Sequence, residues 1–231
     1  AISSALSVLR APASPHLPPA SRAPCLTTTP APFFFGSVTV DGHDTCEVSL
    51  TDVSQIVGSV LQDIDTQMVA SVVEDEMLFG LENFGVPHDQ IEQRVSETLE
   101  TVGISDLRDR EIATLSGGQK QKVAIAAILA MRPRVLVLDE PTAALDPASS
   151  TLVFETLREA NRALGITIVV VEQKVALLSE YCNRVLVLNH GEIALQGEPH
   201  EVFAHTDELR AIGVDCPRVT RIFNSLEADG W

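Results

Sequence analysis

Short aliphatic runs recur along the second half of the chain, at residues 135–138, 166–171 and 185–188. Runs of this length without polar alternation are typical of strands that are buried on both faces of a parallel sheet. Residues 38–40, followed by Asp41-Gly42, and residues 55–61 predict two earlier strands. The pattern therefore predicts a sheet whose strands are mostly internal.

Helical periodicity fills the intervals between these runs. Residues 88–102 place four apolar side chains on one helical face, and Gly103 follows as a C-terminal signal. Asp146 and Pro147 predict the start of a second helix, which is expected to run to Gly165. Alternation of strands and helices predicts an α/β fold, with a mostly parallel sheet covered by helices.

Residues 1–35 differ in composition from the rest of the chain. They hold more than half of the thirteen prolines and no Asp or Glu. Proline at this density opposes helix interiors and sheet ladders. We therefore predict that residues 1–35 are a disordered or aberrant segment, and that the folded domain covers residues 36–231.

Charge and cysteine content exclude several classes of function. The net charge of −16 disfavours binding to nucleic acid, which depends mainly on Lys and Arg. The four cysteines form no Cys-x-x-Cys pair, which indicates reduced thiols rather than a zinc site. No apolar stretch approaches the length of a transmembrane helix, and the first residues lack the pattern of a signal peptide.

Two short motifs carry candidate chemistry. Ser116 is placed to cap a helix that begins at Gly117-Gly118, followed by Gln119, and the amides of such a helix start form an anion site. Asp139 ends a buried strand, where a carboxylate commonly orders the waters of a phosphate-bound Mg²⁺. Glu140 follows and can orient or deprotonate an attacking water. Taken singly, the first motif is more often only a turn, and paired acids are often a helix cap or a solvated loop.

In combination these motifs resemble those of ATP-binding cassette (ABC) proteins. Residues 115–119 look like the signature motif, residues 135–140 like a Walker B strand with its catalytic glutamate, and residues 144–146, ending at Asp146, like the D-loop. The resemblance implies ATP and Mg²⁺ as ligands. It also implies that two ATP-binding domains face each other, with each ATP between the P-loop of one domain and the signature motif of the other.

Residues 62–67 and 79–87 narrow the resemblance to energy-coupling factor (ECF) transporters. The first segment is similar to their Q-loop and the second to the start of their helical subdomain, here at about residues 68–131. ECF transporters import vitamins or metal ions. The resemblance implies a peripheral protein at the cytoplasmic face of the membrane, with a second ATPase subunit and a transmembrane coupling subunit as partners. It also implies that Gln62 senses the nucleotide and its Mg²⁺.

The chain departs from the family pattern in two places. No Gly-x-x-x-x-Gly-Lys-Ser/Thr loop occurs, although the family's first two strands and P-loop helix should precede Gly36. Pro19-Ala20-Ser21-Arg22 can be encoded by bases that give Gly-Lys-Ser in another frame, so frameshift, truncation and true loss all stay open. Gln173 stands where the family has a switch histidine, and an amide can hydrogen-bond a γ-phosphate but cannot carry a proton.

Three interpretations follow from these residues. The first is an ECF-type ATP-binding subunit that cannot hold ATP in its own P-loop site and lends its signature motif to a second copy or a related ATPase. The second is a non-transport ABC ATPase, although neither a coiled-coil insertion nor a basic surface is apparent. The third is a fragment without a stable fold, because losing central strands would uncover apolar neighbours.

Overall fold

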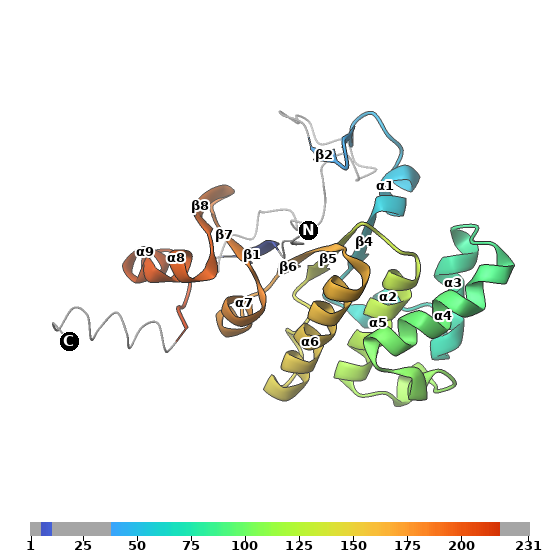
Figure 1. Ribbon diagram of the computed structural model, residues 1–231. Coiled ribbons are helices and arrows are strands. Elements are labelled where there is room, and N and C mark those ends of the chain that lie inside the picture. Colours follow the sequence, from blue (N-terminus) through green and yellow to red (C-terminus); the bar gives the residue numbers. More distant parts are fainter. Residues whose placement is uncertain (1–5, 11–37, 218–231) are drawn as a thin grey trace.

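The computed structural model of the chain describes residues 6–10 and 38–217. Within them, six strands form one sheet in the order β4-β5-β6-β1-β7-β8 (Figure 1). These strands are β1 (Leu6–Arg10), β4 (Val57–Val60), β5 (Val135–Asp139), β6 (Thr167–Val171), β7 (Arg184–Asn189) and β8 (Glu192–Gly197). A small hairpin of β2 (Thr39–Val40) and β3 (His43–Asp44) turns at Asp41-Gly42, as predicted.

The sheet is parallel from β4 to β7, and only β8 runs antiparallel to its neighbour. The register sets Val60 of β4 beside Leu138 of β5, and Asp139 of β5 beside Val171 of β6. Because parallel strands end at the same edge, the loops after β4, β5 and β6 begin next to one another. The predicted α/β fold with a mostly parallel sheet is confirmed.

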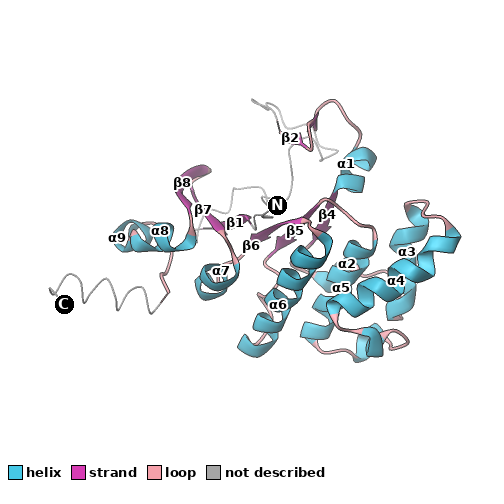
Figure 2. Cartoon of the chain, in the orientation of Figure 1, coloured by secondary structure: helices cyan, strands magenta, loops and turns pink. Residues whose placement is uncertain are grey.

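The long helices pack on one another and on the sheet, and Figure 2 shows α5 and α6 on the same side of the strands. The helices are α1 (Leu50–Ile56), α2 (Ile64–Gln67), α3 (Val73–Asn83), α4 (His88–Val102), α5 (Gly117–Ala130), α6 (Pro147–Leu164), α7 (Val175–Tyr181), α8 (Pro199–Ala204) and α9 (Thr206–Ala211). None of the helices in the described part of the chain combines the length and the apolar character needed to cross a membrane.

The segment between β4 and β5 is mainly helical, with one isolated antiparallel bridge between Val72 and Glu111. Helices α3 and α4 pack against α5, and the short 3-10 turns η2 (Ser105–Leu107) and η3 (Ile112–Thr114) connect α4 to α5. These helices occupy the range that we predict as the helical subdomain, about residues 68–131. The division of the chain into separate units remains a prediction.

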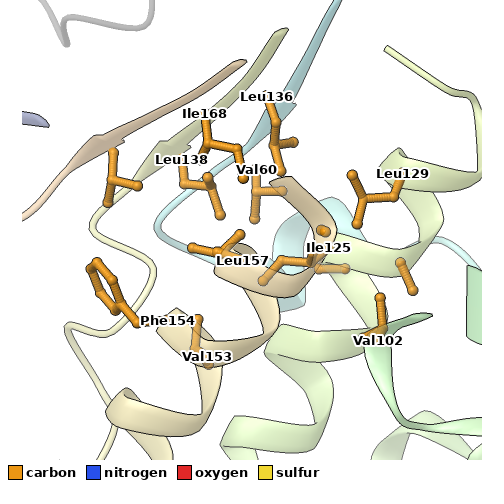
Figure 3. Packing of buried hydrophobic residues seen from close by; sticks show 14 of the residues in the cluster. Val60, Val102, Ile125, Leu129, Leu136, Leu138, Val153, Phe154, Leu157 and Ile168 are labelled. Atoms are coloured by element: carbon orange, nitrogen blue, oxygen red, sulfur yellow. The ribbon is translucent and has the colours of Figure 1, made fainter. Parts of the chain in front are cut away.

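The core lies between the sheet and helices α5 and α6. Figure 3 shows side chains of the strands meeting those of the two helices. The labelled members are Val60, Leu136, Leu138 and Ile168 from the strands, Val102 from α4, Ile125 and Leu129 from α5, and Val153, Phe154 and Leu157 from α6. Burial of this aliphatic layer supplies the main driving force that holds the loops at the edge of the sheet in place.

The start of one predicted strand differs from the structure. The strand expected over residues 55–61 begins at Val57, because Ser49 caps a helix, α1, that runs through Ile56. In this cap Asp52 N–H donates to the Ser49 hydroxyl, and the Asp52 carboxylate accepts from Ser49 N–H at 3.0 Å. The local capping signal therefore extends a helix into residues whose side chains favour a strand.

Leu6–Arg10 belong to the segment, residues 1–35, that we predict to be disordered or aberrant, and the bounds of that segment remain a prediction. These five residues form β1, which pairs with β6 on one side and β7 on the other. Pairing with two neighbours places β1 inside the sheet, and its carboxyl end faces the same edge as those of β5 and β6. The remaining residues of that segment, 1–5 and 11–35, lie outside the described residues, as do residues 218–231.

Gly58 is required by close packing between β4 and α5. A Cβ atom at this position would lie 2.2 Å from Cγ2 of Ile128 and 3.3 Å from Cγ of Pro133. Gly58→Ala is therefore expected to lower the free energy of unfolding by about 1–3 kcal/mol, measured by urea denaturation.

Gly80→Ala is the matched control for Gly58→Ala. Gly80 lies inside α3, and its nearest neighbour would be the flexible Sδ of Met131 at 3.3 Å. Alanine is favoured over glycine in a helix by about 1 kcal/mol, so this variant is expected to be neutral or stabilised. Equal losses in the two variants would contradict the packing account.

Arg108 joins α3 to α4 through two carboxylates. Its guanidinium forms ion pairs with Glu74 and with Glu92, the latter at 2.7 Å. The hydrogen bonds from Arg108, and then that from Ser96, hold the pKa of Glu92 at about 2, against an ordinary value of 4.5. Glu92 therefore contributes stability that is complete above about pH 4.5 and is lost as the pH falls through about 2.

Arg108→Met is expected to lower the free energy of unfolding most above pH 4.5, with the difference from wild type shrinking toward pH 2. Arg132→Met is the control. Arg132 pairs with Glu97, but the pKa of Glu97 is lowered mainly by a hydrogen bond from Gln93 and less by Arg132. The stability of this variant relative to wild type is therefore expected to depend less on pH. Denaturant unfolding between pH 6 and pH 2.5 measures both. A difference for Arg108→Met that stays constant over this range would contradict the assignment.

Candidate functional site

Gln62, Glu140 and Gln173 meet at the carboxyl edge of the sheet. They follow β4, β5 and β6, which are neighbours in the sheet. Gln62 Nε2 donates to Oε2 of Glu140 at 3.1 Å, and Gln173 Nε2 donates to Oε1 at 2.6 Å. The structure thus joins three of the residues that the sequence singles out into one hydrogen-bonded cluster, called here the edge cluster.

The backbone of Glu140 turns its side chain away from the line of β5. Its φ of 46° lies in the left-handed region, which non-glycine residues rarely adopt. The turn is held by a hydrogen bond from Glu140 N–H to the carbonyl of Val171, at 2.8 Å. Asp139, the last residue of β5, stays in the ladder opposite Val171. The strand therefore ends at Asp139, and the chain changes direction at Glu140.

The chemistry available to the edge cluster follows from its donors. Both neighbours of the Glu140 carboxylate are neutral amides, which orient it without adding positive charge. A half-buried carboxylate held in this way can position a water and accept its proton. Gln173 cannot exchange protons as a histidine does, so its action on Glu140 is limited to holding it.

The residues at this edge are of the chemical kind that could hold a magnesium ion. Carboxylate and amide oxygens are the ligands that Mg²⁺ prefers, and they are offered by Asp139, Glu140 and the Oε1 atom of Gln62. The bond from Gln62 to Glu140 uses Nε2 and leaves Oε1 out of that contact. No group of three or more His, Cys, Asp or Glu in residues 6–10 and 38–217 has the arrangement of a metal site. Mg²⁺ bound to phosphates needs only one or two carboxylates.

Ser116 caps α5, as predicted. Its hydroxyl accepts from Gln119 N–H at 3.3 Å, and Gln119 Oε1 accepts from Ser116 N–H at 2.9 Å. The reciprocal cap involves only Ser116 and Gln119. The N–H groups of Gly117 and Gly118 lie in the first turn, where a helix offers them no internal acceptors. The start of α5 therefore retains the features of an anion site.

The two glycines of this motif also have a packing role that sequence analysis does not identify. A Cβ atom on Gly117 would lie 3.2 Å from Cδ2 of Leu145, and one on Gly118 would lie 3.2 Å from Cβ of Ser149. The start of α5 thus packs directly against the loop before α6 and the first turn of α6. Residues 141–150, called here the α6 entry segment, include both of these contacts.

Asp146 acts as the N-cap of α6. Its carboxylate accepts from Ala148 N–H at 3.0 Å, Ser149 N–H at 3.1 Å and the Ser149 hydroxyl at 2.5 Å. The Ser149 hydroxyl, followed by the backbone amides, lowers the pKa of Asp146 below its usual range. The predicted cap is confirmed, and a contact of Asp146 with nucleotide remains a prediction.

Glu172 and Lys174, on either side of Gln173, connect it to the α6 entry segment. The buried Glu172 carboxylate accepts from the Thr142 hydroxyl, and from the N–H groups of Gln173 and Lys174. Lys174 Nζ donates to the carbonyls of Thr142 at 2.7 Å and Leu145 at 3.1 Å. It also donates to the Ser150 hydroxyl at 2.8 Å.

Sequence analysis did not give these two residues a role. Neither Glu172 nor Lys174 is among the residues that the sequence singles out. The available signal was a buried aliphatic run followed directly by charged residues, which indicates that the charges are partnered at the end of the strand.

Comparison with known proteins places this site in a family. The family model described as ABC transporter matches residues 26–143. The Energy-coupling factor transporter ATP-binding protein EcfA1 of Clostridium perfringens is 41% identical over 196 residues, which cover 84% of this chain and 69% of the relative. The protein of that name from Symbiobacterium thermophilum is 46% identical over 198 residues, covering 84% and 68%.

This chain belongs to the ABC transporter family, among its ECF ATP-binding proteins. The solved structure of cbiO1 from Clostridium perfringens, described as part of the ABC transporter complex cbiONQ, has a TM-score of 0.73 and 29% identity. That alignment covers 96% of this chain and 87% of cbiO1. The ABC-type P-loop NTPase fold and the resemblance to ECF proteins are both confirmed.

Replacement of Ser116 in this ABC protein tests the cap on α5. Ser116→Ala is expected to lower the free energy of unfolding by about 0.5–2 kcal/mol, because the Gln119 amide loses its acceptor. Ser116→Asn and Ser116→Asp keep an acceptor and are expected to remain near wild type. Chemical denaturation of the three variants measures the effect, and an unchanged Ser116→Ala variant would show that the cap contributes nothing.

Proposed function

We propose that this chain is the ATP-binding subunit of an ECF-type importer, coupling ATP binding and hydrolysis to the uptake of a vitamin or metal ion. The observation that carries the proposal is the edge cluster, in which one carboxylate is held by the Q-loop glutamine and by the residue at the switch position. Support comes from the ECF relatives, which match this chain over most of its length.

For a nucleotide at this edge, each residue of the cluster has a defined task. Bound MgATP supplies the phosphoanhydride that water cleaves. Were a nucleotide held at this edge, Glu140 would orient that water and take its proton, while Gln173 would fix the Oε1 atom of Glu140. Gln62, through its amide oxygen, and Asp139, through water, would then be the residues that hold the metal.

The signature motif serves the ATP held by a second subunit. Ser116 and the amides of Gly117 and Gly118 face outward from the start of α5, where the helix dipole favours an anion. Gln119 is tied to Ser116 through the reciprocal cap, which keeps the hydroxyl and the amides in one rigid turn. Asp146 supports the same face by capping α6 beside Gly118.

We further propose that this copy does not hold ATP in a P-loop of its own. The sequence contains no Gly-x-x-x-x-Gly-Lys-Ser/Thr, and its three lysines have other contacts. Lys120 pairs with Asp65 at 2.7 Å, Lys122 approaches the carbonyl of Val102 at 3.5 Å, and Lys174 holds the α6 entry segment. A pair of identical copies would then hold no ATP, so the partner is a related subunit that carries a P-loop.

A groove on the helical segment fits the transmembrane coupling subunit. It has a volume of about 410 Å³ and is lined by Val69, Ala70, Asp75, Leu78, Phe79 and Glu82. The buried Glu76 carboxylate shapes one wall by accepting from Val69 N–H at 2.9 Å and Ala70 N–H at 2.8 Å. Exposed apolar side chains beside two acids suit a basic amphipathic segment at the cytoplasmic face of the membrane.

Two variants separate the signature face from the edge cluster. The assay mixes this chain with a P-loop-bearing ECF relative whose own signature serine has been replaced, and it measures ATP hydrolysis. Wild-type chain is expected to restore turnover, and Ser116→Asp to lower it at least about 100-fold, because a carboxylate repels the phosphate while the cap is kept. Ser116→Asn is the neutral control for the charge.

Glu140→Gln is expected to leave turnover of this mixture unchanged, because the ATP that is hydrolysed lies on the partner's P-loop. The chain alone is expected to show no saturable MgATP binding by calorimetry up to about 1 mM. Loss of turnover in Glu140→Gln would show that hydrolysis takes place at the edge cluster of this chain. It would contradict the proposal that this copy holds no ATP of its own. Formation of the mixed dimer without any restored turnover would contradict the proposed use of the signature face.

A further inference from the structure

We propose that Lys174, together with Glu172, is a positioning residue that couples the signature face to the edge cluster. This inference deepens the proposed function and rests on it for its biological meaning. It starts from the contacts of the α6 entry segment, which touches the signature glycines on one side and the Gln173 loop on the other.

The first link is the contact between the start of α5 and the α6 entry segment. Gly117 and Gly118 approach Leu145 and Ser149 so closely that a methyl group at either glycine would contact the segment at 3.2 Å. Interfaces packed at this density do not deform continuously. A displacement of α5 when a phosphate binds its first turn is therefore passed to Leu145 and Ser149.

The second link is made by Lys174. Its ammonium group donates three hydrogen bonds to the α6 entry segment, at 2.7 Å to Thr142, 3.1 Å to Leu145 and 2.8 Å to Ser150. An ammonium group has three protons to donate, so these three acceptors satisfy it completely. The side chain is half-buried, which makes loss of any one acceptor costly.

Glu172 supplies a second, independent connection. Its carboxylate is only 2% exposed and accepts from the Thr142 hydroxyl with one oxygen. With the other oxygen it accepts from the backbone N–H groups of Gln173 at 2.9 Å and Lys174 at 3.2 Å. The peptide groups on both sides of Gln173 are thus fixed to the same segment that Lys174 holds.

The last link is Gln173 itself. Its backbone is held by Glu172, and its Nε2 atom donates to Glu140 at 2.6 Å. Glu140 in turn accepts from Gln62, whose loop leads into α2. A movement of the α6 entry segment therefore shifts the Gln173 amide relative to Glu140, so that the edge cluster responds to phosphate bound at the signature face even without ATP of its own.

The test records the resonances of the Gln173 side-chain amide by ¹⁵N NMR of the full chain without nucleotide. Because no ATP is present, the result does not depend on whether the proposed ATP function is correct. Lys174→Met is expected to shift the Gln173 Nε2 resonances toward those of a solvent-exposed glutamine. It is also expected to speed hydrogen exchange of the Leu145 amide at least about tenfold. Lys174→Arg keeps a donor group, so its Gln173 resonances and its Leu145 exchange rate are expected to stay close to those of wild type.

Lys122→Met is the control for loss of a lysine side chain, because the hydrogen bond from Lys122 Nζ goes to the carbonyl of Val102, at 3.5 Å, and not to the α6 entry segment. Neither readout is expected to change in it. Thr142→Val, which removes the hydroxyl bonded to Glu172, is expected to shift the Gln173 signal in the same direction and serves if Lys174→Met does not fold. Faster exchange of the Leu145 amide with an unchanged chemical shift of Gln173 Nε2 would show that Lys174 stabilises only the α6 entry segment, and it would overturn the proposal.

Discussion

Parallel pairing of β4, β5 and β6 is the constraint on which the rest of the structure depends. Their register brings Val60 beside Leu138 and Asp139 beside Val171, so that three loops leave the sheet at one edge. The aliphatic layer between the strands and helices α5 and α6 fixes that register, because a shift by one residue would expose the core face of each strand. The bonds from Gln62 and Gln173 to Glu140 are short only while this register holds.

Two parts of the molecule carry the function, and they differ in what they contain. The signature face has a complete cap and two glycines that permit close packing. The edge cluster has its carboxylate and both amides, while the loop that would cradle phosphates there is missing from the sequence. The α6 entry segment contacts both parts, and on our proposal it makes the edge cluster respond to the signature face.

Local signals predicted the fold wherever they acted within a few residues. The helix from His88 to Val102 and the caps at Ser116 and Asp146 were predictable because capping and periodicity are short-range effects. β1 was not, because its membership in the sheet depends on pairing with β6 and β7, more than 150 residues away in sequence. Its five residues also lie beside a proline-rich stretch that argues against strands.

The site was predictable in its parts and only partly in its connections. Glu140 was predictable because it follows a buried strand, whereas Gln62 and Gln173 were singled out by the resemblance to the ABC family. Their mutual hydrogen bonds depend on the left-handed turn at Glu140, for which the sequence carries no sign. The roles of Glu172 and Lys174 depend on the distance between two loops, and that distance is set by how α6 packs on the sheet.

A structure of the chain with its P-loop-bearing partner, ATP and Mg²⁺ tests the central claim most directly. We expect nucleotide against Ser116 to Gln119, with its phosphates on the partner's P-loop, and none at the carboxyl end of β1. Nucleotide bound at the end of β1, in contact with Glu140, would show that this chain holds its own ATP and would contradict the account.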